Sequence, residues 1–253
     1  MSERRVALIA PAGTYVGPEL ARLLARRNYD LVLASPPAGL ADELQASGVR
    51  VVVVGDLDDG TPSMGSFGID IGQRMVDAAI TTFGTFASAF FSSGRIALGK
   101  FTRMSTDDLR SAFHGNVELP FAFAQAVLPT LLAQGDGQIL VATSATALRP
   151  TTSASVYAAT RSAATILLQS AALEVAAANV QLNVVGTNFM DFPEFLRGNR
   201  VETAQDRHRV ESMVPMNRLG TMTEFAAFCA TFLDGTSRFA TGQFFPYAGG
   251  WAR

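Results

Sequence analysis

Apolar runs of strand length alternate with helical patterns along the chain, and this alternation limits its possible folds more than any other feature. A run at residues 4–11, a glycine-containing turn, a helical pattern at 17–27 and a run at 29–34 form a β-α-β unit. Further runs follow at 49–54, 86–91, 138–143, 180–185 and 243–247. We therefore expect an α/β fold: a Rossmann-like, doubly wound parallel sheet of about seven strands with helices on both faces.

The size and composition of the chain fit one domain. Its 253 residues are 48% hydrophobic, enough to fill a sizeable core, and no repeat or linker divides them, so we expect a single domain over 1–253. The formal charge of −2 gives no basic surface for nucleic acid or an anionic membrane. With neither a signal-peptide pattern nor an uninterrupted apolar stretch of about 18 residues, we expect a cytoplasmic protein without a membrane partner.

Residues that often bind metals are scarce. The only cysteine, Cys229, lies in the helical pattern EFAAFCATFL, where we expect it to be a buried apolar residue. The two histidines, His114 and His208, do not form a recognisable ligand spacing. We therefore expect no metal.

Three side chains form a candidate site for proton transfer. Ser144 follows the apolar run at 138–143, at the end of a strand where α/β proteins bind ligands. Tyr157 and Arg161 are one helical turn apart, so the guanidinium lies beside the phenol and favours its ionised form. The spacing predicts Tyr157 as a general base, with Ser144 on the same substrate oxygen.

Several motifs resemble the short-chain dehydrogenase/reductase superfamily over nearly all of the chain. They are Asn116 in the helix FHGNVELPFAFAQAVLP, Ser144 at a strand end, Tyr157, and the C-terminal TGQFFPYAGGW. The resemblance implies a Rossmann-type fold and a catalytic tyrosine.

The chain departs from that superfamily where a nicotinamide cofactor would bind. Pro11 and Tyr15 replace two glycines of the family's TGxxxGxG loop, and a phenol there obstructs the pyrophosphate. The second strand ends in LASPP without an acidic residue for the ribose, the NNAG motif is replaced by AFFS, and the YxxxK lysine is Arg161. We therefore expect no nicotinamide cofactor.

This pattern resembles the halohydrin dehalogenases, a cofactor-independent branch with a Ser-Tyr-Arg triad. The resemblance implies that Ser144, Tyr157 and Arg161 are catalytic. It also implies a pocket for halide or another small anion, formed by Tyr15, Thr187, Asn188, Phe189 and Met190, with backbone amides of the loop facing the anion. The implied reaction is reversible displacement of halide from vicinal halohydrins to give epoxides, and epoxide opening by azide, cyanide or nitrite.

The superfamily resemblance also predicts a substrate lid and an assembly. The lid covers about 186–212, and its expected apolar wall comprises Phe192, Phe195, Leu196 and, from the C-terminus, Trp251. The other interpretation is that these residues only pack the segment down. The helices near 106–132 and 152–178 are unusually apolar, and with family habit they indicate a homotetramer.

Two other functions stay open on the sequence. One is a divergent NAD(P)-dependent short-chain oxidoreductase, in which Arg161 replaces the lysine's contact to the ribose. The other is a catalytically silent binding or regulatory protein. The presence of Ser144, Tyr157 and a cation together argues against a silent protein.

Overall fold

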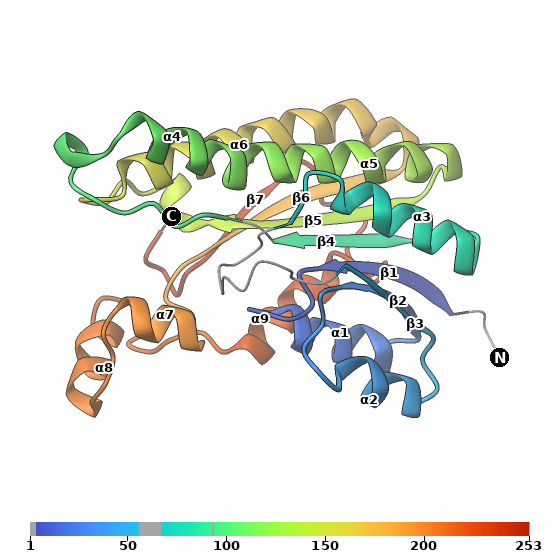
Figure 1. Ribbon diagram of the computed structural model, residues 1–253, viewed down its shortest axis with the longest axis horizontal. Helices are drawn as coiled ribbons and strands as arrows, with labels where there is room; N and C mark the ends of the chain where they lie inside the picture. The colour runs from blue at the N-terminus through green and yellow to red at the C-terminus, as the bar shows by residue number, and fades with distance from the viewer. Residues whose placement is uncertain (1–3, 56–66, 93, 253) are drawn as a thin grey trace.

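The computed structural model describes residues 4–55, 67–92 and 94–252 (Figure 1). Within these residues, seven strands form one sheet in the order β3-β2-β1-β4-β5-β6-β7, and all neighbouring pairs are parallel. The strands are β1 (Arg5–Ala10), β2 (Tyr29–Ala34), β3 (Val51–Val54), β4 (Ser88–Ser92), β5 (Gly137–Ser144), β6 (Val180–Thr187) and β7 (Phe244–Tyr247). This confirms the single-domain, doubly wound parallel sheet expected from the sequence.

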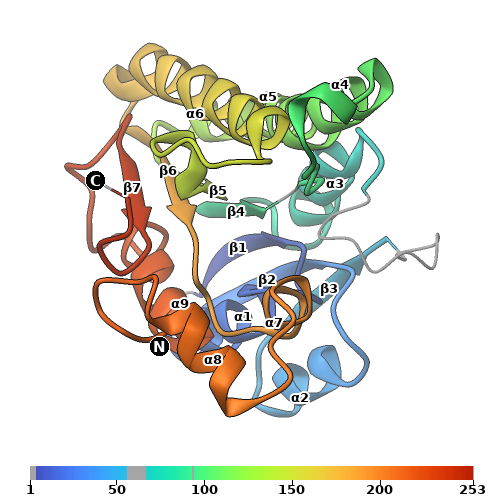
Figure 2. The same cartoon turned by 90° about the vertical axis from the view of Figure 1, so that its left-hand side faces the viewer.

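Helices cover both faces of the sheet, as Figure 2 shows. One face carries α1 (Gly17–Arg26), α2 (Leu40–Ala46) and α9 (Met222–Thr231); the other carries α3 (Ile71–Phe83), α5 (Leu119–Gln134) and α6 (Ser155–Val175). Side chains alternate along each strand, so Leu8 of β1 faces one core and Ile9 faces the other. Cys229 of α9 is buried in the second core, as expected.

The long helical segment before β5 is interrupted. Helix α4 (Thr106–Phe113) begins with a capping box between Ser105 and Asp108, and a π-helical turn at His114–Glu118 joins it to α5. The whole segment, Thr106–Gln134, meets the length and composition of a membrane span. It nevertheless buries Phe123 of α5 in the core, as a helix packed on a sheet does. The sequence predicts the segment but not its π-helical turn.

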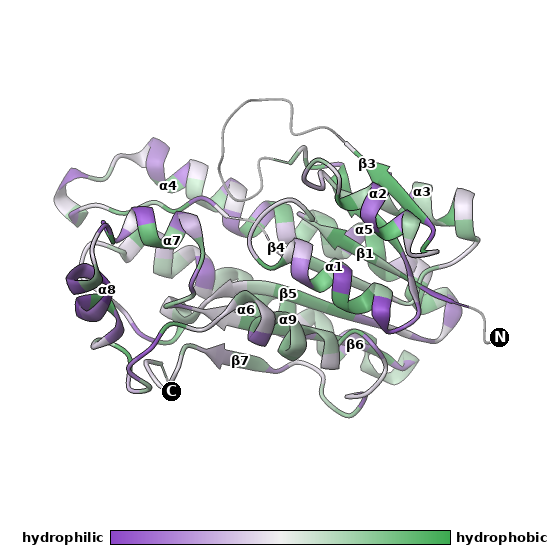
Figure 3. Ribbon diagram, turned by 90° about the horizontal axis from the view of Figure 1, so that it is seen from below, coloured by the Kyte–Doolittle hydropathy of each residue, from purple (hydrophilic) through white to green (hydrophobic). Residues whose placement is uncertain are grey.

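The connection from β6 to α9 passes the carboxyl edge of the sheet. It carries α7 (Pro193–Gly198) and α8 (Ala204–Glu211), which lie beyond the strand ends in Figure 1. Figure 3 shows that α8 is hydrophilic, whereas the strands are hydrophobic. The segment predicted as a lid, 186–212, therefore lies next to the edge where Ser144 ends β5.

Candidate active site

Ser144 is fixed at the carboxyl edge of the sheet by its neighbours. It is the last residue of β5, is only 4% exposed, and pairs in the parallel ladder with Thr187, the last residue of β6. The Ser144 hydroxyl accepts hydrogen bonds from the Thr146 hydroxyl (2.9 Å) and the Thr146 amide (3.2 Å), and donates to the Thr187 carbonyl (3.4 Å). The sequence analysis does not predict this role of Thr146. Its position two residues after Ser144 is the sequence feature that points to the contact.

Tyr157 and Arg161 lie together in the first turns of α6. The guanidinium carbon of Arg161 is 5.1 Å from the centroid of the Tyr157 ring, in a cation–π arrangement that confirms the proximity expected from their spacing. Arg161 is 2% exposed, and its Nε has no hydrogen-bond partner among the described residues. No carboxylate of the described residues lies within ion-pair distance of the Arg161 guanidinium. A buried cation without a carboxylate is costly, so this one is available to a phenolate or a bound anion.

Gly94 and Asn116 shape the space around the Arg161 side chain. A Cβ atom at Gly94 would overlap the Arg161 guanidinium and the Asn116 side-chain oxygen. From the π-helical turn, the Asn116 amide donates to the Thr160 hydroxyl (2.8 Å) and the Arg95 carbonyl (3.0 Å), and it accepts from the Arg95 N–H (2.9 Å). Asn116 thus ties the loop after β4 to α6, and Gly94 is a site residue that sequence reasoning missed.

Tyr15 crosses from the β1–α1 turn to the end of β6. Its hydroxyl donates to the Thr187 Oγ1 at 2.5 Å. Its ring packs against Phe192 (centroid distance 4.9 Å) and against Phe225 of α9 (5.4 Å). Burial raises the pKa of the Tyr15 phenol well above its usual value, so the hydroxyl stays protonated and remains a donor. The structure therefore brings together Tyr15, Thr187 and Phe192.

The loop at 188–190 does not present its amides as expected. The Phe189 N–H already donates to the Asn188 side chain (2.9 Å), and Met190 forms a parallel bridge with Gly220. Phe189 has a left-handed backbone (φ 56°), which directs its ring into an apolar cluster. Of the three amides expected to face an anion, the middle one, that of Phe189, is therefore already satisfied by a neighbouring side chain.

The other residues of the expected apolar wall pack on one another. Phe195, Leu196 and Trp251 belong to the same cluster as Phe189, whose ring centroid is 5.5 Å from that of Trp251 and 5.8 Å from that of Phe195. The guanidinium of Arg149 lies over the Trp251 ring at 4.8 Å. Of the predicted wall, only Phe192 contacts Tyr15, and the rest fits the alternative interpretation of a segment packed onto the domain.

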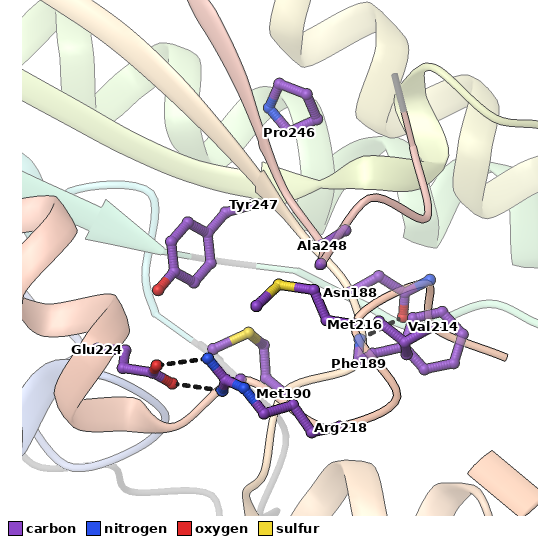
Figure 4. Close-up of a pocket in the computed structure, with 12 residues that line it drawn as sticks. Asn188, Phe189, Met190, Val214, Met216, Arg218, Glu224, Pro246, Tyr247 and Ala248 are labelled. Carbon is purple, nitrogen blue, oxygen red and sulfur yellow. Dashed lines mark hydrogen bonds and ion pairs between the residues drawn. The ribbon is translucent and has the colours of Figure 1, made fainter. Parts of the chain in front are cut away.

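A separate hollow of about 200 Å³ lies beside this loop (Figure 4). Its lining includes Met190, Met216 and Tyr247, and the ion pair between Arg218 and Glu224 lies at its wall. None of the three residues Ser144, Tyr157 and Arg161 lines it. It is therefore distinct from the candidate catalytic residues.

A parallel seven-stranded sheet with a serine ending β5, and a tyrosine beside a cation in the next helix, defines the short-chain class of α/β oxidoreductase folds. A family model described as enoyl-(acyl carrier protein) reductase matches residues 16–252. The chain belongs to the short-chain dehydrogenase/reductase superfamily.

Relatives and solved structures agree with this class. The chain is 25% identical to a cyclohexanol dehydrogenase of Acinetobacter sp. (strain SE19), over 94% of this chain and 91% of that protein. It is 23% identical to an acetoacetyl-CoA reductase of Acinetobacter sp. (strain RA3849), over 99% and 98%. A Serratia marcescens short-chain dehydrogenase/reductase superposes with a TM-score of 0.85 at 20% identity, covering both chains fully. A dehalogenation enzyme superposes with a TM-score of 0.82 at 22% identity, covering 99% of each chain.

These comparisons overturn the expected function. The expectation of a halohydrin dehalogenase, a lyase without a cofactor, is wrong, because the matching model and the curated relatives carry the names of reductases and dehydrogenases. The likeness to the dehalogenation enzyme is at an identity that shows the fold alone. The physical reason for the error is that a serine, a tyrosine and a cation serve proton transfer in either chemistry, so the triad does not distinguish them.

The residues that would hold a nicotinamide dinucleotide do not fit it in this conformation. Tyr15 lies across the carboxyl edge at the turn where the pyrophosphate would bind. Pro11 has no amide hydrogen to donate to a phosphate. Ser35, which follows β2, donates its hydroxyl hydrogen to the Gly55 carbonyl (3.3 Å). Of the three loop glycines in the family pattern, Gly17 is the one present here. It allows close backbone packing, because a Cβ at this position would overlap the Pro11 carbonyl.

Proposed function

We propose that this protein is a short-chain oxidoreductase that interconverts an alcohol and a carbonyl compound, for which a bound nicotinamide nucleotide would supply or accept the hydride. The structural observation that supports the proton transfer is the Arg161 guanidinium over the Tyr157 ring, in the helix that follows the Ser144 strand, and the choice of oxidoreduction rests on the relatives. The names of the curated relatives, which describe dehydrogenases and reductases of alcohols and carbonyl compounds, support the same reaction class.

The side chains divide the handling of the substrate oxygen between them. Ser144 hydrogen-bonds the carbonyl oxygen by turning its single hydroxyl hydrogen from the Thr187 carbonyl, a long bond of 3.4 Å, to the substrate, while the bonds from Thr146 hold the serine oxygen in place. Tyr157 donates its phenolic proton to the carbonyl oxygen in the reducing direction and removes the hydroxyl proton in the oxidising direction. Arg161 stabilises the phenolate that forms when the proton has left Tyr157.

The segment 186–212 is proposed to close over the substrate. It contains α7 and α8, and Phe192 within it touches the Tyr15 ring, at the edge where β5 and β6 end. An apolar side chain at this point favours a substrate whose carbon skeleton is hydrophobic.

The chain is further proposed to form a homotetramer through α5 and α6. These helices lie side by side on one face of the molecule in Figures 1 and 2. Large apolar side chains are exposed on both: Ile166 (63%) and Leu173 (73%) on α6, and Phe121 and Leu132 on α5. Such a patch on two adjacent helices marks an interface more often than a free surface.

The proposed reaction is tested with purified protein, NAD(H) or NADP(H), and a panel that includes cyclohexanol, cyclohexanone and acetoacetyl-CoA. Turnover is followed by the absorbance of the reduced nicotinamide. We expect turnover with at least one substrate, and a loss of at least about 100-fold in Tyr157→Phe and in Ser144→Ala. Folding of each variant is checked by circular dichroism.

One result would overturn the proposal. It is the absence of turnover with either nucleotide, together with halide release from a vicinal halohydrin in nucleotide-free buffer that Tyr157→Phe abolishes. In that case the same residues would move the same proton in a different reaction.

A further inference from the structure

Tyr15 is held in an unfavourable backbone conformation by three contacts. Its φ of 54° is in the left-handed region, which residues with a Cβ adopt rarely and glycine adopts freely. The hydrogen bond to Thr187 and the packing on Phe192 and Phe225 hold the ring there. Backbone strain of this kind concentrates at ligand-binding sites, where surrounding contacts maintain it.

The hydrogen bond between Tyr15 and Thr187 lies where a dinucleotide would bind, and it therefore obstructs that site. Strands β1 and β6 are not neighbours, since β4 and β5 lie between them. A side chain from the turn after β1 that bonds the last residue of β6 therefore passes over the carboxyl ends of β4 and β5. In doubly wound sheets, dinucleotides bind along that edge, at the point where the strand order reverses.

A polar atom next to the bridge lacks a partner. The Thr14 hydroxyl, adjacent in sequence to Tyr15, is buried and forms no hydrogen bond within the described part of the chain. Buried hydroxyls in folded proteins nearly always have a partner, so this one is a donor left for another group. A phosphate oxygen is a suitable acceptor at a turn that leads into a helix N-terminus.

We propose that Tyr15 is a latch that determines access of a dinucleotide to the groove. The nucleotide binds when the hydrogen bond between Tyr15 and Thr187 opens and the ring leaves the edge of the sheet. The measured affinity is then the intrinsic affinity reduced by the fraction of open molecules. This inference rests on the proposed oxidoreductase function, and it accounts for the Tyr15 ring at the turn where the pyrophosphate would bind.

The latch also connects two parts of the molecule. Phe192 immediately precedes α7, and its ring packs on Tyr15 in an edge-on contact. Movement of Tyr15 removes that contact, so nucleotide entry loosens the start of the segment 186–212 before the substrate binds.

The test measures dissociation constants of NADH and NADPH, by nucleotide fluorescence, for the wild type and four variants. Tyr15→Phe and Thr187→Val each remove one partner of the hydrogen bond, and we expect either to tighten binding roughly two- to tenfold. Tyr15→Gly removes the ring and suits the left-handed backbone, so we expect tightening of more than about tenfold. Tyr247→Phe is the matched control: Tyr247 packs on the same Phe225 ring and pairs with Thr187 in the β6–β7 ladder, but among the described residues its hydroxyl forms no hydrogen bond with Thr187, so loss of that hydroxyl should leave the affinity unchanged.

The outcomes separate the latch from the function on which it rests. Equal affinities in the wild type, Tyr15→Gly and Thr187→Val overturn the latch, and turnover with nucleotide would then still support the oxidoreductase. Weaker binding in Tyr15→Gly also overturns it, because Tyr15 would then be part of the nucleotide site. Absence of binding and of turnover in every variant overturns both proposals. Melting temperatures establish whether each variant folds. If Tyr15→Gly does not fold, the affinities of Tyr15→Phe and Thr187→Val test the latch.

Discussion

Arg161 presents its guanidinium to the face of the Tyr157 ring at 5.1 Å while remaining 2% exposed. Among the described residues, its Nε has no hydrogen-bond partner and no carboxylate lies within ion-pair distance. This cation therefore lacks the compensation that buried charges usually have. Arg161 can therefore stabilise a negative charge that forms on Tyr157 in the proposed reaction, or one that a bound ligand brings.

Replacement of Arg161 should separate charge from packing. We expect Arg161→Gln to lower kcat by about 100-fold or more, since the phenolate loses its cation. Arg161→Lys should retain most of the activity because it restores a positive charge. Steady-state kinetics of the three proteins check this, and an unchanged kcat in Arg161→Gln would contradict it.

Substitution of Gly94 should disturb the same cation without removing it. A Cβ in Gly94→Ala overlaps the Arg161 guanidinium and the Asn116 oxygen, so we expect a destabilisation of about 1–3 kcal/mol and reduced kcat. Gly198→Ala is the control, since nothing lies within 4 Å of the position that its Cβ would take. Urea unfolding and steady-state kinetics measure the two effects. Equal stability of both variants would show that the site accommodates the methyl group.

Glu224 should make stability depend on pH in the acid range. Hydrogen bonds from Arg218 and from the Thr221 amide and hydroxyl lower the pKa of Glu224 from its usual 4.5 to about 2. Because the pKa is lower in the folded chain, the carboxylate stabilises the fold above about 4.5, and this contribution disappears as the pH falls toward about 2. We expect Glu224→Gln to melt below the wild type at pH 7, with a difference that narrows as the pH approaches 2. An equal difference in melting temperature at pH 7 and near pH 2 would contradict this.

The exposed apolar side chains of α6 should hold the assembly together. Charges introduced by Ile166→Glu with Leu173→Glu would have to be buried in the proposed interface, so we expect a lower mass in light scattering than for the wild type. Ile80→Glu, at a similarly exposed position on α3, should leave the mass unchanged. A monomeric wild type would refute the tetramer.

The strands were predictable because each is a continuous apolar run, and a sheet covered on both faces requires such runs. The predicted bounds differ mainly at the edges: β5 extends to Ser144 and β6 to Thr187, since pairing in the ladder lengthens both strands. The contact between Tyr157 and Arg161 was also predictable, because helical geometry alone fixes it.

Other features depend on contacts between distant parts of the chain, and the sequence did not predict them. The bond between Tyr15 and Thr187 joins residues 172 positions apart. The π-helical turn at His114–Glu118 contains Asn116, which bonds Arg95 and Thr160, and helical periodicity carries no signal for this turn. The sequence does not predict the reaction class, because a serine, a tyrosine and a cation transfer a proton in either chemistry.

Asn116 bonds both backbone groups of Arg95 and the Thr160 hydroxyl through a single side-chain amide. The amide therefore fixes the loop after β4 to the start of α6 beside Arg161. Under the proposed function, adjustment to substrates of different shape would then fall to the segment 186–212.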